Sequence, residues 1–188
     1  RVASESGRLG RVVSNMLDLA RLERGAQIAN PQPGEIGEAV SRCVERLRSS
    51  LGEAGLTITT EIADDLPTAG FDVDALCQIL DNLLDNAEKY TRDRPDRQAV
   101  VTVDQAAEGI EITVSDNGPG IHGITRRALF APFKRPSGDD APAGLGLGLA
   151  LAKSLARAQG GDLVLAEQHE TGAAFVLTLP SSGGPALA

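Results

Sequence analysis

Two asparagines, a lysine and a tyrosine near the middle of the chain are the residues whose types and spacing first suggest chemistry. Asn82, Asn86 and Lys89 are four and three positions apart, so on a helix they lie on one face. Asparagine is a poor helix former, and an ordinary solvated face explains this pattern less well than a bound ligand does. Amide oxygens suit Mg²⁺ and a lysine suits phosphate. Tyr90, the only tyrosine of the chain, follows directly.

A second candidate is the run Asp116-Asn117-Gly118-Pro119-Gly120, which follows an expected strand. A tight turn alone would account for the glycines and the proline. It does not account for a carboxylate at the end of an apolar strand. Such a carboxylate, beside glycine backbone that lets a planar group approach, can accept a hydrogen bond from an exocyclic amine.

A third candidate is the glycine-rich run Gly-Leu-Gly-Leu-Gly-Leu at 144–149, which opens an expected helix. It is not the dinucleotide fingerprint, because Leu149 stands where the last glycine belongs and no strand precedes it. It is not a P-loop either, because no Gly-Lys-Ser/Thr follows. It is still backbone that can wrap an anion at a helix N-terminus, where N–H groups and the helix dipole favour negative charge.

Together and in this order, the segments 81–90, 116–120, 129–133 and 144–149 closely resemble the N, G1, F and G2 boxes of bacterial sensor histidine kinases. The segment 172–180 looks like the closing strand of that family. The resemblance implies the Bergerat ATP-binding fold of the GHKL superfamily. That fold is α+β, a two-layer sandwich with a mixed sheet and three helices on one face, and it holds ATP beneath a flexible lid.

The resemblance assigns roles to single residues around the phosphates. It implies that Asn86 binds Mg²⁺, that Asn82 assists from one turn back, and that Lys89 and Arg135 face phosphate; these four are the expected catalytic residues. The full expected set of nucleotide-contacting residues is Asn82, Asn86, Lys89, Tyr90, Asp116, Gly118, Gly120, Ile121, Phe133, Gly144, Leu145, Gly146, Leu147 and Gly148.

By the same resemblance, Tyr90 covers the adenine and Asp116 accepts a hydrogen bond from its amine. Phe130 and Phe133 anchor the lid, although a core role alone would account for both. Lys134 stands where the family often has an aromatic residue, so the sequence does not define the packing of the lid.

Position 82 separates function classes. Related ATPases carry a glutamate one turn before the metal-binding asparagine, where it activates water as a general base. Asn82 cannot accept a proton at neutral pH, which favours phosphoryl transfer over hydrolysis. The acceptor of the family lies in a His-Glu/Asp motif, and neither His122 nor His169 matches it, so both are expected to be surface residues.

The expected function is therefore that of a histidine kinase catalytic domain. It binds Mg-ATP and transfers the γ-phosphate to a histidine on its own dimerisation hairpin, outside this chain, for relay to an aspartate of a response regulator. Two alternatives stay open: a non-catalytic ATP-binding scaffold or sensor, and a GHKL ATPase.

Three regions are expected from the sequence pattern. Residues 1–28 carry an amphipathic helix over 1–24 that either joins a bundle or packs on its own domain, and 16–23 resembles the second helix of the dimerisation hairpin. Residues 34–180 form the ATP-binding domain and 181–188 a disordered tail. The expected helices are 35–54, 72–90 (capped by Asp72), 124–130 and 147–159, and the expected strands are 56–62, 98–105, 109–115, 162–167 and 174–179.

Composition limits the partners and the location. The net charge of −8 argues against nucleic-acid binding and against docking on anionic membranes. No apolar run approaches the length of a membrane span and no signal peptide is visible, so we expect a cytoplasmic domain, whether or not the parent sensor is anchored in a membrane. The resemblance implies that the full-length sensor is a homodimer. Cys43 and Cys77 make no disulfide framework and are expected to be unpaired and buried in a reducing compartment.

Overall fold

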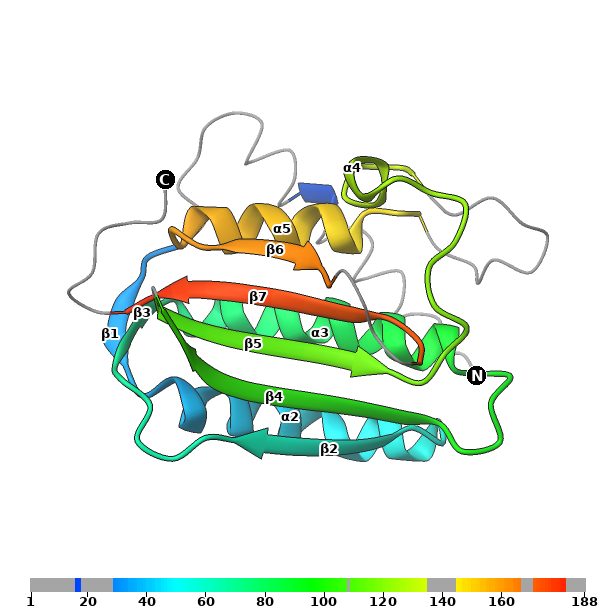
Figure 1. Cartoon of the computed structure of the whole chain (residues 1–188), viewed down its shortest axis with the longest axis horizontal. Coiled ribbons are helices and arrows are strands. Elements are labelled where there is room, and N and C mark those ends of the chain that lie inside the picture. The colour runs from blue at the N-terminus through cyan, green and yellow to red at the C-terminus, as the bar shows by residue number, and fades with distance from the viewer. Residues whose placement is uncertain (1–15, 18–28, 108, 135–144, 167–170, 182–188) are drawn as a thin grey trace.

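The fold alternates short strands with three long helices (Figure 1). The computed structural model describes residues 16–17, 29–107, 109–134, 145–166 and 171–181. The elements are, in order, β1 (Gln32–Gly34), α2 (Ile36–Glu53), β2 (Thr57–Ile62), β3 (Ala69–Phe71), α3 (Val73–Tyr90), β4 (Gln98–Ala106), β5 (Gly109–Asp116), α4 (Arg126–Leu129), α5 (Gly148–Ala158), β6 (Asp162–Leu165) and β7 (Ala174–Pro180).

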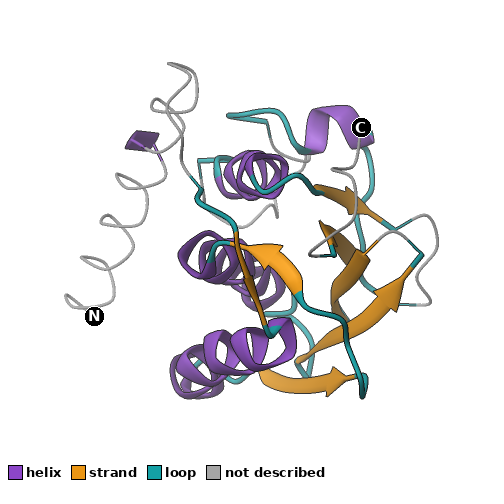
Figure 2. Ribbon diagram, turned by 90° about the vertical axis from the view of Figure 1, so that its left-hand side faces the viewer, coloured by secondary structure: helices purple, strands orange, loops and turns teal. Residues whose placement is uncertain are grey.

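Five strands form one mixed sheet in the order β2-β4-β5-β7-β6. β2 runs parallel to β4, and every other neighbouring pair is antiparallel. The helices form one layer and the strands the other, with α2, α3 and α5 on the same side of the sheet (Figure 2). The predicted α+β sandwich with a mixed sheet and three helices on one face is confirmed.

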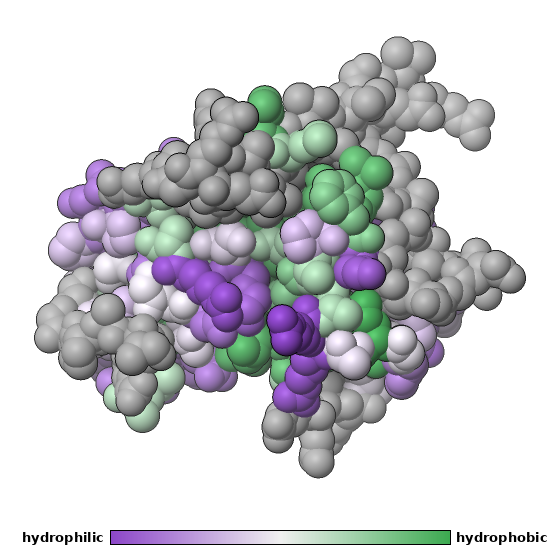
Figure 3. Space-filling model, turned by 90° about the horizontal axis from the view of Figure 1, so that it is seen from above, coloured by the Kyte–Doolittle hydropathy of each residue, from purple (hydrophilic) through white to green (hydrophobic). Residues whose placement is uncertain are grey.

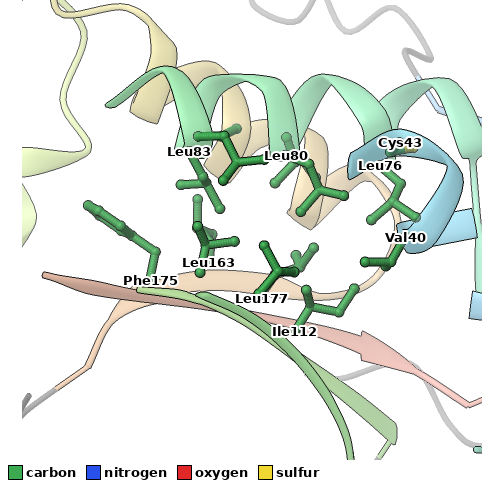
Figure 4. Packing of buried hydrophobic residues seen from close by; sticks show 14 of the residues in the cluster. Val40, Cys43, Leu76, Leu80, Leu83, Ile112, Leu163, Phe175 and Leu177 are labelled. Carbon is green, nitrogen blue, oxygen red and sulfur yellow. The ribbon is translucent and has the colours of Figure 1, made fainter. Parts of the chain in front are cut away.

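The core lies between this sheet and α3. Alternate residues of β5, such as Ile110 and Ile112, are fully buried, as the alternating pattern of a strand with one covered face requires. Leu76, Leu80 and Leu83 of α3 face them from the helix layer, as Figure 4 illustrates for this cluster. This packing fixes the height of α3 above the sheet.

The start of α3 is capped as predicted. The Oδ1 atom of Asp72 accepts a hydrogen bond from the backbone N–H of Ala75 at 3.0 Å, and its Oδ2 accepts one from the N–H of Asn30 at 2.8 Å. The N–H of Asp72 donates to the side chain of Gln159, just after α5, at 2.8 Å. One residue thus ties the beginning of α3 to the end of α5.

Some predicted boundaries differ from the structure. The strands β1 and β3, which pair with each other, were not predicted because each has three residues and they contain Pro33, Gly34 and Gly70, which break the alternating pattern. The helix expected at 124–130 is the single turn α4. Of the helix expected at 1–24, the structure describes only Met16 and Leu17, which are helical.

The expectation of two unpaired cysteines is wrong. A disulfide joins Cys43 of α2 to Cys77 of α3. The two helices pack side by side under the same sheet, and this brings the Cα atoms of the two cysteines to 5.3 Å, within the range of a disulfide. A separation of 34 residues in the sequence gives no sign of that contact. Among the described residues, no helix is long and apolar enough to cross a membrane.

Candidate functional site

Elements that carry many of the residues singled out in the sequence reach one end of the molecule, on the right in Figure 1. The second half of α3, the end of β5, the start of β7 and the start of α5 all lie there. β5 and β7 are antiparallel neighbours, and Ser115 pairs with Ala174, so Asp116 at the end of β5 lies beside the turn that enters β7.

The carboxylate of Asp116 is held by backbone N–H groups. Asp116 is only 9% exposed, and its Oδ1 accepts hydrogen bonds from the N–H of Gly118 at 2.8 Å and of Ala173 at 3.3 Å. The backbone N–H of Asp116 donates to the carbonyl of Ala173 at 2.9 Å. These contacts, from the turn after β5 and the turn before β7, set the orientation of the carboxylate.

Two glycines leave room around this carboxylate. A Cβ on Gly118 would lie 2.8 Å from Oδ1 of Asp116, closer than real side chains come, and 3.0 Å from the carbonyl oxygen of Tyr90, which is an unusually tight contact. Gly172 has a φ of +71°, and a Cβ there would overlap the carbonyl oxygen of Asp116. Gly172 and Ala173 were not predicted as site residues, because only the pairing of β5 with β7 places them against Asp116.

The end of α3 lies beside the turn after β5, because a Cβ on Gly118 would come within 3.0 Å of the carbonyl oxygen of Tyr90. Asn82, Asn86 and Lys89 on α3 are partly exposed. The side-chain N–H of Asn82 donates to the carbonyl of Gln78 at 2.8 Å. Gly148, at the start of α5, packs so closely that a Cβ there would lie 2.7 Å from Oδ1 of Asn82. Lys89 forms an ion pair with Asp85, one turn back on the same face, a partner that sequence reasoning missed.

The donors on this face fit a Mg²⁺ ion that keeps most of its coordination for water and phosphate. Asn82 and Asn86 bring neutral amide oxygens and Asp85 brings a carboxylate, all of them oxygen ligands of the kind that Mg²⁺ prefers. Within the described residues no group of three or more His, Cys, Asp or Glu side chains forms a site that could hold a metal by itself.

A hydrogen bond joins the segment after α4 to the glycine-rich run. The backbone N–H of Phe133 donates to the carbonyl of Gly146 at 3.0 Å. Phe133 has a φ of +61°, rare for a residue with a side chain, and is 65% exposed, while Leu145 is 50% exposed. In Figure 3, hydrophobic residues gather on part of the face that carries α4 and α5. Arg135 and Gly144 lie outside the described residues.

Phe130 differs from Phe133, because its ring packs into the fold. The ring lies edge-on to Phe175, with centroids 6.3 Å apart, and the Nζ atom of Lys153 lies 4.6 Å from its centroid. Leu147 is buried at the start of α5. These contacts leave the lid role of Phe133 a prediction and give Phe130 a place in the core.

Arginines of the loop between α3 and β4 bind the end of α3 and the turn after β5. Glu88 is 8% exposed and forms ion pairs with Arg92 and Arg97, both at 3.0 Å. Burial opposes ionisation of Glu88, but hydrogen bonds from the two arginines outweigh it, so the pKa of Glu88 lies below its usual value. Arg94 donates to the carbonyl of Gly118 at 3.0 Å. The three arginines at 92, 94 and 97 are the sequence feature that could have pointed to these contacts.

The remaining predicted positions lie at the rim. Gly120 and Ile121 follow the turn after β5 and are partly exposed. His122 is exposed, as expected, and its Nε2 lies 3.0 Å from the carbonyl of Pro119. His169 lies outside the described residues.

This fold and site define a GHKL-type nucleotide-binding domain. A family model described as histidine kinase-, DNA gyrase B- and HSP90-like ATPase matches residues 71–183. The chain belongs to this family, and the predicted resemblance to sensor histidine kinases is confirmed.

Among curated relatives, an uncharacterized sensor-like histidine kinase of Rhizobium meliloti is 36% identical over 179 residues, which cover 93% of this chain and 33% of the relative. The sensor protein KdpD of Escherichia coli is 31% identical, over 94% of this chain and 19% of KdpD. The chain therefore spans a third or less of the length of these two relatives.

A solved structure of full-length ShkA in complex with AMPPNP superposes with a TM-score of 0.75 at 28% identity, covering 97% of this chain and 38% of ShkA. The histidine kinase ThkA, solved in complex with the response regulator protein TrrA, superposes equally well at 18% identity, over 96% of this chain and 49% of ThkA. At that identity the likeness to ThkA concerns the fold.

Proposed function

We propose that this chain is the catalytic, ATP-binding part of a sensor histidine kinase. It binds Mg-ATP and transfers the γ-phosphate to a histidine supplied by a dimerisation hairpin. The observation that carries the proposal is the buried carboxylate of Asp116, held by the backbone N–H groups of Gly118 and Ala173. The sensor histidine kinases among its relatives support the same activity.

The base-binding half of the site rests on Asp116. A carboxylate fixed by the N–H groups of Gly118 and Ala173 is ready to accept a hydrogen bond from an exocyclic amine without reorganisation. Gly118 keeps the approach free of side-chain atoms. Tyr90, whose backbone borders Gly118, is the residue that we propose covers the adenine.

The phosphate-binding half rests on α3. Asn86 would hold Mg²⁺ as its protein ligand, with Asn82 in support, and the ion would supply positive charge that neutralises the phosphates. Lys89 is paired with Asp85, so we propose that its ammonium group exchanges this partner for phosphate. Arg135 and the glycines at 144, 146 and 148 remain the proposed lid contacts.

The amide side chain of Asn82 favours phosphoryl transfer over hydrolysis of ATP. Its side-chain amide donates to Gln78 and packs against Gly148, and an amide at this position cannot take a proton from water. The domain then needs to position ATP and balance charge, while the nucleophile comes from elsewhere.

The partners and the setting follow from the same proposal. We propose that the phosphate passes on to an aspartate of a response regulator, as suggested by the complex of ThkA with TrrA. We further propose that 1–28 belongs to the dimerisation hairpin and 34–180 to the catalytic domain, and that the full-length protein is a cytoplasmic or membrane-anchored homodimer.

The test supplies the acceptor separately. Labelled ATP, Mg²⁺ and a purified dimerisation hairpin that carries its histidine are mixed with this chain, and a hairpin with that histidine replaced by glutamine is the control. We expect label on the first hairpin and none on the second. Tight ATP binding with no label on either hairpin would favour the scaffold alternative. Steady phosphate release without a hairpin, abolished by Asn82→Ala, would favour the ATPase.

A further inference from the structure

The disulfide between Cys43 and Cys77 has no part in the proposed ATP binding. We propose that it is a site of reversible thiol–disulfide exchange with low-molecular-weight thiols such as glutathione. In a reducing compartment, which the proposed location implies, a protein disulfide is usually transient and serves catalysis or redox sensing. The disulfide joins two helices, one of which carries the proposed phosphate-binding residues, so the exchange would change how firmly that helix is held.

The two cysteines differ in exposure. Cys43 is 2% exposed, whereas Cys77 is only partly buried, which favours attack of an incoming thiolate at the sulfur of Cys77 over attack at that of Cys43. The thiolate attacks this sulfur, the S–S bond breaks, and Cys43 leaves as a thiolate that takes up a proton. A second thiolate then attacks the mixed disulfide and releases Cys77. Two small thiols become one small disulfide, and the protein gains two thiols.

The structure holds the two cysteines together by other contacts as well, so the exchange can run backwards. Val40 and Val44 of α2 and Leu76 and Leu80 of α3 belong to one buried cluster (Figure 4). About one turn further on, Arg46 and Asp81 form an ion pair at 2.9 Å that also links the two helices. In the reduced form the thiols therefore stay close, and a small disulfide can re-form the bond through the same mixed disulfide at Cys77.

The consequence concerns α3 and rests on the proposed function. Cys77 lies one turn and a half before Asn82, and Asn86 and Lys89 follow on the same helix. The bond restrains α3 against α2. After reduction the helix fluctuates more, and binding of Mg-ATP must then order it at a cost in free energy. The oxidised form is thus the form with the higher affinity for Mg-ATP.

The exchange is tested on the folded chain in glutathione redox buffers. Samples are alkylated and weighed by mass spectrometry while circular dichroism follows the fold. We expect no alkylation of the oxidised chain, two alkyl groups after reduction with the fold retained, and reversal by oxidised glutathione. In Cys43→Ser, glutathione is expected to stay attached to Cys77, and Cys77→Ser is the matched control. Resistance to reduction in the folded state, loss of the fold on reduction, or two thiols in the untreated chain would each overturn the proposal.

The second arm measures Mg-ATP affinity of both redox forms by calorimetry. We expect the reduced form to bind about fivefold more weakly, a typical coupling between two sites. Equal Mg-ATP affinities of the two redox forms would refute the effect of the disulfide on α3 but would leave the exchange itself in place. Absence of ATP binding in both forms would instead count against the proposed function, and the alkylation result would stand.

Discussion

The carbonyl oxygen of Asp116 lies so close to Gly172 that a Cβ at position 172 would overlap it. The same aspartate receives a hydrogen bond from the next residue, Ala173. The turn that enters β7 therefore packs directly against Asp116 at the end of β5. A glycine with positive φ at this point is what allows Asp116 to keep its orientation.

Replacing Gly172 by alanine tests this relationship. We expect Gly172→Ala to lower the free energy of unfolding by about 1–2 kcal/mol for the left-handed backbone, and by roughly another 1–3 kcal/mol for crowding against Asp116. Gly123→Ala is the matched control, because Gly123 has a φ of +70° and nothing within 4 Å of its Cβ position. Urea unfolding of both variants gives the difference, and equal losses would mean that the contact with Asp116 does not matter.

The base-reading role of Asp116 predicts a change in nucleotide affinity. Asp116→Asn keeps an oxygen for the N–H groups of Gly118 and Ala173 but presents an amide where a carboxylate should accept. We expect ATP and ADP affinities to fall alike by about 1–3 kcal/mol, or roughly ten- to hundredfold. Asp104→Asn, an exposed change on β4, should leave both unchanged. Unaltered ATP affinity in Asp116→Asn, or GTP binding as tight as ATP binding to the original chain, would refute the role.

The ion pairs of Glu88 predict a stability that depends on pH. The pKa of Glu88 is lowered in the folded state, so its contribution is complete above the unfolded pKa of about 4.3 and is lost as the pH falls through the lower folded pKa. In Glu88→Gln we expect the fall in stability between about pH 5 and pH 3 to become shallower.

Unfolding midpoints in urea at several pH values measure this slope, with the exposed substitution Glu53→Gln as control. The control should keep the slope of the original chain. If Glu88→Gln and the original chain lose stability in parallel as the pH falls, the pairs with Arg92 and Arg97 are not the cause.

Much of the fold could be predicted because local signals were strong. Asp72 and the apolar spacing of the following residues defined α3, and the alternation in β4 and β5 defined the centre of the sheet. β1 and β3 could not be predicted, since a strand of three residues that includes proline or glycine shows no alternation of apolar and polar side chains. The pairing of Cys43 with Cys77 depends on which helix faces meet, and this is decided by tertiary packing.

The site was predictable where its residues lie on one element. Asn82, Asn86 and Lys89 share a face of α3 by spacing alone. The residues that hold the site in place were missed because they act across elements: Ala173 reaches Asp116 from the turn before β7, and Arg94 reaches Gly118 from the loop before β4. The type of Ala173 carries no sign of its contact, and the arginines at 92, 94 and 97 show a basic loop without showing which groups they bind.

Calorimetric titration of ATP with and without Mg²⁺ measures whether the polar face of α3 and Asp116 hold Mg-ATP together. We expect Mg²⁺ to raise the ATP affinity of the original chain and of the control Gln105→Ala. In Asn86→Ala the Mg²⁺-dependent gain, roughly tenfold or more, should disappear while the affinity without Mg²⁺ remains. An equal gain in Asn86→Ala would refute Mg²⁺ binding by Asn86, and no ATP binding by the original chain would refute the proposed site.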